Sequence, residues 1–116
     1  MQIRQGQVYW LDIGPVSGSA LAERHPCVVV QNDLFNRSAI ATSVVSLITS
    51  NVSRAKAPVN VLLNKGEANL PKAGVVNVSQ VLTVDKSELV ESIGKLSGSA
   101  AEAVIDGLHP LFQVTS

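Results

Sequence analysis

The sequence has little of several features that would indicate particular classes of protein. Its 116 residues include one cysteine (Cys27), one tryptophan and one tyrosine, and nine basic residues balance nine acidic ones. A single cysteine excludes an intramolecular disulfide and a zinc site built on cysteines. No run approaches the roughly 18 apolar residues of a membrane-spanning helix, and the first ten residues, MQIRQGQVYW, have no apolar leader. We therefore expect a cytoplasmic protein without a membrane partner.

The motifs of cofactor and metal enzymes are missing as well. The sequence has no glycine-rich phosphate loop, HExxH motif, CxxC pair or nucleophile elbow. The two histidines, His25 and His109, lie far apart in the chain. We therefore expect neither a cofactor nor a metal site.

The balance of charge excludes a strongly basic, general nucleic-acid-binding protein. The two parts of the chain differ, however. Residues 1–72 hold seven basic and four acidic residues, a net charge of +3, whereas residues 73–116 hold two and five, a net charge of −3. This asymmetry indicates either a weakly basic face or ordinary surface scatter.

The hydrophobic residues make up 46% of the chain and are mostly Val, Leu, Ile and Ala, which favours strands. Short alternating segments bounded by Gly, Pro, Asn and Asp predict strands over 7–13, 27–31, 39–49, 57–63 and 75–84. Residues 85–97 fit a helical turn followed by a short strand. Pro26 is expected to stand at the start of the second strand.

The last segment predicts a helix. Ser99 and Glu102 match a capping box, and Val104, Ile105 and Leu108, followed by Leu111 or Phe112, have helical spacing. Pro110 is expected to end or kink this helix near Leu108. The predicted fold is therefore mainly β (α+β): one domain over residues 1–116, a small barrel or curled sheet with a C-terminal helix.

The segment AERHPCVVVQND, residues 22–33, places Arg24 and His25 directly before Pro26. Cleavage of RNA by its own 2′-hydroxyl needs only proton transfer and stabilisation of charge on phosphorus. Histidine titrates near neutral pH, and arginine binds phosphate oxygens through its planar fork. A histidine, an arginine and a nearby threonine hydroxyl would suffice, although composition alone leaves other chemistries open.

Five separated motifs carry a family resemblance. The segments QGQVYWLDIGPVSGS, HPCVVVQND with FNR, SLITSN, LPKAGVVNVSQVLTVDKSEL and IGKLS resemble, in order and spacing, those of the PemK/MazF toxins over about residues 4–111. The resemblance implies a single PemK/MazF-like toxin domain with an SH3-like curled antiparallel β-barrel of the PemK/CcdB type and a C-terminal helix. It also implies a homodimeric, metal-independent endoribonuclease of a type II toxin–antitoxin system. Its implied partners are single-stranded RNA, including mRNA, and a cognate antitoxin, with DNA contacted only through the antitoxin complex.

The same resemblance implies the site residues. Thr49 matches the family's catalytic threonine, whereas the usual arginine before the proline is His25, with Arg24 one position earlier. Either His25 transfers the proton or Arg24 turns in to hold the phosphate. Seven residues match positions that bind RNA or shape its groove: Ser17, Gly18, Ser19, Asn32, Asn36, Ser50 and Gln80. Groove polarity is expected to differ from that of many members, because Ala20, Ser79 and Leu82 replace two acidic residues and an arginine.

Alternatives remain at this stage. The chain could be a binding module of the same fold, such as a CcdB-like gyrase poison, a homologue without nuclease activity, or an accessory protein. Thr49 could simply end a strand, and Cys27 is expected to be an inert core residue. Trp10 is expected in the core, and Tyr9 or Phe35 are expected to be better placed to meet a base.

Overall fold

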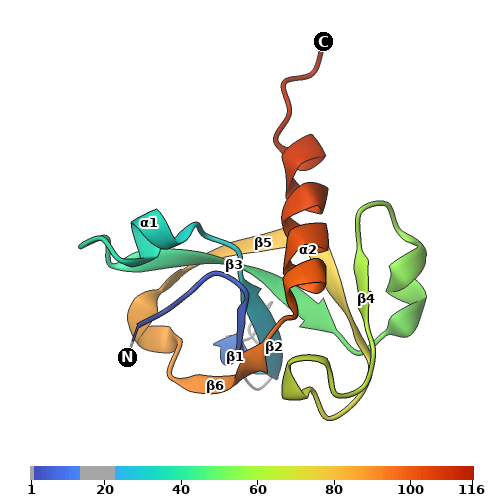
Figure 1. Ribbon diagram of the computed structural model, residues 1–116, viewed down its shortest axis with the longest axis horizontal. Helices are drawn as coiled ribbons and strands as arrows, with labels where there is room; N and C mark the ends of the chain where they lie inside the picture. The colour runs from blue at the N-terminus through green and yellow to red at the C-terminus, as the bar shows by residue number, and fades with distance from the viewer. Residues whose placement is uncertain (1, 14–22) are drawn as a thin grey trace.

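A curled antiparallel sheet forms the body of the molecule (Figure 1). The computed structural model describes residues 2–13 and 23–116. In these residues six strands follow the order β4-β5-β3-β2-β1-β6, and every pairing is antiparallel. The strands are β1 (Gln7–Ile13), β2 (Glu23–Val29), β3 (Thr42–Thr49), β4 (Val61–Leu63), β5 (Gly74–Asp85) and β6 (Glu91–Lys95). The predicted mainly-β fold with a C-terminal helix is confirmed.

Helical segments connect and flank the strands. In the described ranges the α-helices are α1 (Asp33–Asn36) and α2 (Gly98–Leu111), and the 3₁₀ turns are η2 (Val52–Lys56), η3 (Glu67–Asn69) and η4 (Lys86–Glu88). Within the described residues, no helix has the length and apolar character required to cross a bilayer.

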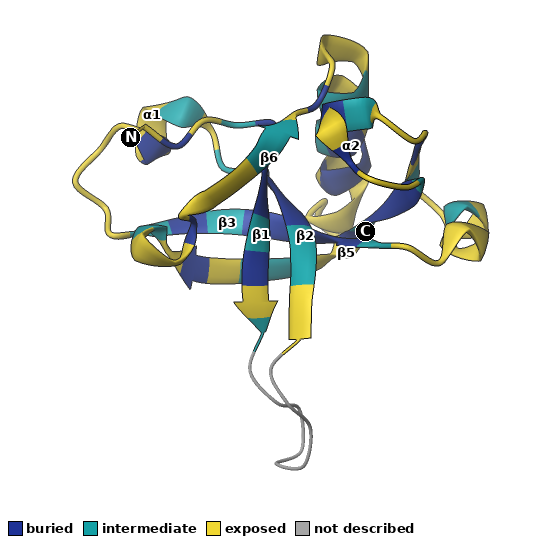
Figure 2. Cartoon of the chain, turned by 90° about the horizontal axis from the view of Figure 1, so that it is seen from below, coloured by how far each residue is buried: buried dark blue, intermediate teal, exposed yellow. Residues whose placement is uncertain are grey.

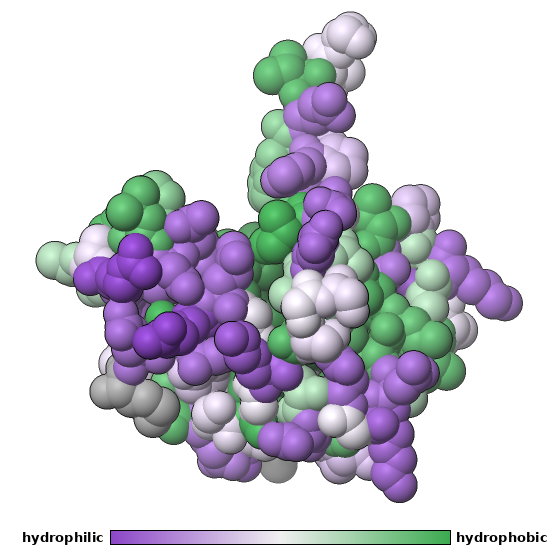
Figure 3. All heavy atoms as spheres, in the orientation of Figure 1, coloured by the Kyte–Doolittle hydropathy of each residue, from purple (hydrophilic) through white to green (hydrophobic). Residues whose placement is uncertain are grey.

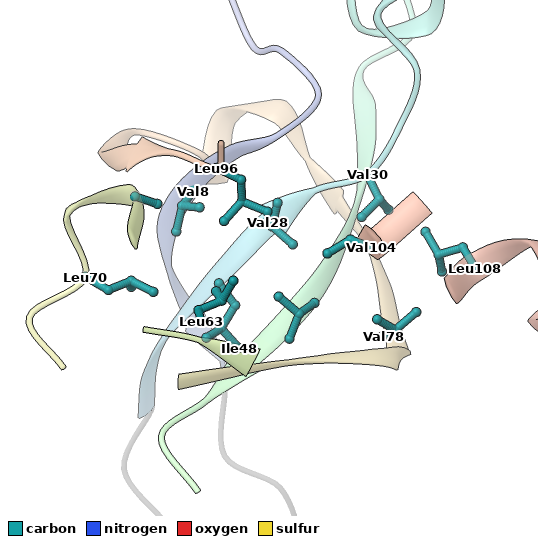
Figure 4. Packing of buried hydrophobic residues seen from close by; sticks show 12 residues of the cluster. Val8, Val28, Val30, Ile48, Leu63, Leu70, Val78, Leu96, Val104 and Leu108 are labelled. Atoms are coloured by element: carbon teal, nitrogen blue, oxygen red, sulfur yellow. The ribbon is translucent and has the colours of Figure 1, made fainter. Parts of the chain in front are cut away.

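The sheet presents two core-forming faces because successive side chains of a strand point to opposite sides. On one face Val8, Val28 and Ile48 pack with Val104 and Leu108 of α2 (Figure 4). On the other face Tyr9 packs with Cys27, and both are fully buried. Burial raises the pKa of the Cys27 thiol to about 12. A hydrogen bond with the Tyr9 backbone has the opposite, smaller effect on this pKa. Cys27 is therefore a buried apolar residue, as predicted.

The segment around η3 links β6 to the chain that follows β4, the strand at the opposite end of the sheet order. Asn69 Nδ2 donates to the Ile93 carbonyl at 3.1 Å. A Cβ atom on Gly94 would lie 2.4 Å from the Ala68 carbonyl oxygen, so only glycine fits at this contact. This closure gives the half-barrel its shape and anchors the chain that leads from η3 into β5.

Strand β2 begins earlier than predicted. It starts at Glu23, so Pro26 lies inside the strand rather than at its start. The reason is that residues 23–26 pair with β1 alone, and pairing with β3 begins only at Cys27. A proline is tolerated in a strand where one side has no ladder to complete. Figure 2 shows β2 buried where it pairs with both neighbours and intermediate to exposed along this unshared part.

Helix α2 also differs from the prediction at both ends. Its N-cap is Ser97, not Ser99: Ser97 Oγ accepts from the Ala100 amide at 3.3 Å. The Ser97 amide donates to Glu67 of η3 at 2.8 Å, so a glutamate distant in sequence replaces the expected Glu102. Tertiary packing thus selected an earlier start.

The C-terminal end of α2 continues past the predicted stop. Pro110 lies in the last turn, where it removes only one helical hydrogen bond, and the helix ends at Leu111. This end projects from the body of the molecule (Figures 1 and 3). Leu111 and Phe112 are 41% and 69% exposed, so the predicted apolar stripe packs on the sheet only as far as Leu108.

Candidate active site

A cleft opens where β2 and β3 stop pairing. The ladder between them runs from Val29–Val45 to Cys27–Leu47 and ends there. Two more residues in the same register would set His25 opposite Thr49, but the strands separate instead. The cleft has a volume of about 270 Å³ and is lined by Trp10, Arg24, His25, Pro26, Ile48, Thr49, Ser50 and residues 70–74. The structure therefore brings Arg24, His25, Thr49 and Ser50 together.

Arg24 lies on the face of β2 that carries Trp10. Pro26 pairs with Trp10 across the ladder, which makes Arg24 the diagonal neighbour of that ring. The guanidinium carbon lies 4.9 Å from the Trp10 ring centroid, a cation–π contact. The guanidinium also forms an ion pair with Glu91 of β6, and 47% of the Arg24 side chain remains exposed. Arg24 is thus held at the cleft by two neighbouring strands and still faces solvent.

His25 points to the opposite face of the extended strand from Arg24. Its Nε2 atom lies 3.0 Å from Glu23 Oε2, and its side chain is 38% exposed. Glu23 is on the same face, two residues earlier, where a carboxylate orients the imidazole. Both side chains nevertheless line the cleft, and the strand stays extended between them.

Thr49 is the last residue of β3. Its Oγ1 accepts a hydrogen bond from the Asn51 amide at 3.2 Å, and Asn51 in turn caps η2 through Ser53. A threonine hydroxyl has one donor and two acceptor sites. The strand-end bond therefore leaves the hydroxyl proton of Thr49 available to a ligand in the cleft.

The third wall of the cleft comes from the start of β5. A Cβ atom on Gly74 would lie 3.1 Å from both the Thr49 carbonyl oxygen and Ile48 Cγ2, so the chain enters β5 tight against β3. This contact brings Lys72 to the cleft, a residue that sequence reasoning missed. The available signal was its position as the last of the seven basic residues in the net-positive part of the chain.

Trp10 and Tyr9 have exchanged their expected places. Tyr9 is fully buried, and its hydroxyl donates to Gln7 Oε1 at 2.8 Å. Trp10 is half-buried in the cleft wall. The alternation of β1 places Trp10 on the face opposite Tyr9, where it lines the cleft, and Phe35 is exposed on α1 outside the cleft. The expectation that Tyr9 could meet a base is therefore wrong.

The other predicted RNA-binding residues that the structure describes do not line the cleft. Ser17, Gly18 and Ser19 are outside the described residues. Asn32 caps α1, accepting from the Leu34 amide at 2.8 Å. Gln80 is exposed on β5, where its Oε1 accepts from Asn77 at 3.0 Å.

Asn36 is buried in a polar network at α1. Its Nδ2 donates to the Gln31 carbonyl and to Asp33, and its Oδ1 accepts from Gln31 Nε2 and Ser43 Oγ. Burial favours a higher pKa for Asp33, but hydrogen bonds from the Gln5 amide and Asn36, with Arg37 and Arg4 nearby, lower it overall. This geometry favours a role in shaping the loop rather than in contacting a ligand.

Acidic, cysteine and histidine side chains do not gather in threes to form a metal-binding set anywhere in residues 2–13 and 23–116. The chemistry available in the cleft is that of one imidazole, two cations and hydroxyl groups. These groups suit proton transfer next to a negatively charged centre.

Comparison with known proteins gives consistent matches. The family described as PemK-like, MazF-like toxin of type II toxin–antitoxin system matches residues 4–112. The chain is 40% identical over 109 residues to endoribonuclease MazF6 of Mycobacterium tuberculosis, covering 94% of this chain and 96% of that one. It is 36% identical over 115 residues to endoribonuclease MazF of Staphylococcus saprophyticus, covering 94% and 95%.

Solved structures share the fold. MazF (Form-I) from Deinococcus radiodurans superposes with a TM-score of 0.71 at 25% identity, covering 96% of each chain. MazE–MazF (Form-II) from the same organism gives 0.79 at 19% identity over 99% of each chain. An endoribonuclease in complex with its cognate antitoxin from Mycobacterial species gives 0.69 at 24% identity, covering 92% of this chain and 89% of that one.

Proposed function

The chain belongs to the family of PemK-like, MazF-like toxins of type II toxin–antitoxin systems, and we propose that it is an endoribonuclease that cleaves single-stranded RNA, including mRNA. The observation that carries the proposal is the cleft that joins Arg24, His25 and Thr49. These groups come from two strands that separate at this point, which leaves room for a phosphate between them.

The reaction proposed is attack by the 2′-hydroxyl of RNA on the adjacent phosphorus. The 2′-oxygen forms a bond to phosphorus while the bond to the 5′-oxygen breaks, giving a 2′,3′-cyclic phosphate and a 5′-hydroxyl. The proton of the 2′-hydroxyl goes to a base, and the departing 5′-oxygen takes up a proton. Because the substrate supplies the nucleophile, the chemistry needs no metal.

The residues take distinct parts in this reaction. His25, oriented by Glu23 at 3.0 Å, is the proton carrier. Thr49 donates its hydroxyl hydrogen bond to a phosphate oxygen, where negative charge increases in the transition state. Arg24 lies on the Trp10 side of the cleft and stabilises the same charge. The alternative assignment makes Arg24 the principal catalytic group and leaves His25 a supporting one.

The partners proposed follow from the family. As a type II toxin, the protein is expected to act in the cytoplasm as a homodimer and to be inhibited by a cognate antitoxin protein. DNA would be contacted only through the toxin–antitoxin complex.

The proposal is tested by incubating the purified protein with long single-stranded RNA in EDTA and identifying the product ends. We expect cleavage with 2′,3′-cyclic phosphate and 5′-hydroxyl ends. Thr49→Ala should slow cleavage by about 10²–10³-fold, the effect of losing one donor to a developing oxyanion. His109→Ala, on the exposed last turn of α2, is the matched control and should cleave normally.

An absence of cleavage in every RNA sequence tried would overturn the proposal. Inhibition of gyrase supercoiling by a protein that leaves RNA intact would favour the CcdB-like alternative instead. Circular dichroism of Thr49→Ala shows whether the variant is folded. If it is, the loss of activity is due to the missing hydroxyl.

A further inference from the structure

The charges around the cleft are unequally paired. Arg24 forms an ion pair with Glu91, and His25 lies against Glu23. Lys72 also lines the cleft, yet no carboxylate in the described part of the chain forms an ion pair with it. An exposed ammonium without a partner in a cleft attracts an anion.

The backbone on both sides of Lys72 is anchored. Leu70 is 4% exposed and packs in the core, and its amide donates to the Glu67 carbonyl at 3.0 Å. Gly74 pairs with Leu63 of β4 and lies against the Thr49 carbonyl. Pro71, next to Lys72, has a restricted φ. Lys72 thus stands on a stretch of three residues whose ends are fixed, two residues from the chain that contacts Thr49.

We propose that Lys72 is a phosphate-binding residue of the cleft, which holds the RNA backbone from the side opposite Arg24 and His25. This inference rests on the proposed endoribonuclease function. Lysine binds phosphate as a compact point charge on a flexible stem, so it tolerates small shifts of the phosphate between ground and transition states. Arg24 and His25 each lie against a carboxylate, and Lys72 adds a further positive charge to the cleft.

The test compares Lys72→Gln, Lys72→Arg and the control Lys65→Gln. Lys65 is exposed in the same connection between β4 and β5 but does not line the cleft. The probe is an RNA oligonucleotide carrying the cleavage site mapped on the wild-type protein, with that 2′-hydroxyl methylated so that binding is measured without cleavage. The dissociation constant is measured from low to high salt, and kcat/KM is measured on the unmodified oligonucleotide.

We expect Lys72→Gln to weaken binding at low salt by about tenfold, the loss of one charge-assisted contact. The slope of log affinity against log salt should fall by about 0.7, the value for one phosphate contact with a single strand. Lys72→Arg should restore both quantities because it keeps the charge, and Lys65→Gln should leave both near wild type.

Equal slopes and affinities for wild type and Lys72→Gln, with wild-type cleavage intact, would overturn the inference alone. Equal losses in Lys72→Gln and Lys65→Gln would also overturn it, because they would mean that only net charge matters. A wild-type protein that neither cleaves nor binds RNA would overturn both this inference and the proposed function.

Discussion

The cleft and the network around Asn36 use polar residues in opposite ways. In the cleft the side chains of Arg24 and His25 are 47% and 38% exposed. In the network Asn36 is 5% exposed and Ser43 is fully buried. The Asn36 amide group makes four hydrogen bonds, to Gln31, Asp33 and Ser43. Both regions contain residues that the family resemblance connects with RNA.

The difference shows how to separate binding groups from structural ones. A group with exposed surface and unused hydrogen-bonding capacity can exchange water for a ligand. A buried group whose donors and acceptors are all paired would have to break those bonds first, at a cost of about 1–3 kcal/mol for each one left unsatisfied. Substitutions in the cleft should therefore change activity with little effect on stability, and those in the network the reverse.

The largest effect is expected at His25. His25→Ala should lower kcat/KM for RNA cleavage by about 10²–10⁴-fold, the usual contribution of a general acid or base. The free energy of unfolding should change by less than about 0.5 kcal/mol, since the side chain is exposed. A larger loss of kcat/KM in Arg24→Ala than in His25→Ala would make Arg24 the principal catalytic group instead.

A stability effect of intermediate size is expected at Asn36. Asn36→Ala leaves the buried Ser43 hydroxyl without its acceptor and removes one of the two acceptors of the Gln31 amide, so the free energy of unfolding should fall by about 1–3 kcal/mol. Urea denaturation measures this change. Gln80→Ala, which removes an exposed amide, is the control and should stay within about 0.5 kcal/mol of wild type. A fully stable but inactive Asn36→Ala protein would instead indicate that Asn36 binds the ligand.

The smallest effect is expected from acid titration of the network. Because the pKa of Asp33 is lowered in the folded protein, its carboxylate stabilises the fold above the unfolded-state pKa of about 3.9. This contribution is lost as the pH falls through the lower folded-state pKa. The stability difference between wild type and Asp33→Asn should therefore shrink below about pH 4. Asp106→Asn on the exposed side of α2 controls for net charge, and a constant difference for Asp33→Asn would contradict the assignment.

Local pattern predicted much of the fold. The expected strand over residues 7–13 matches β1, and that over 75–84 lies within β5. Thr49 ends β3 as expected, because turn-forming residues follow it directly in the sequence. Pro26 and Ser99 were misplaced because their roles depend on partners distant in sequence. The β3 ladder begins only at Cys27, and Glu67 supports Ser97 as the cap.

The candidate site was predicted in part. Arg24, His25, Thr49 and Ser50 were identified from short motifs, and the cleft contains all four. Lys72 and Trp10 were missed as cleft residues. Lys72 reaches the cleft through the anchoring of Leu70 and Gly74, and Trp10 through its pairing with Pro26 where β2 and β3 separate. Neither contact leaves a periodic signal in the sequence.

The sequence by itself determined the strand-rich class and the residue types able to transfer a proton or bind phosphate, because these depend on local composition and side-chain chemistry. Only the tertiary structure decided which of those residues meet. The point where β2 and β3 separate, the closure of η3 on β6 and the close approach of Gly74 to Thr49 are all contacts between distant segments. Such contacts form only when the whole sheet curls, so no short segment can encode them alone.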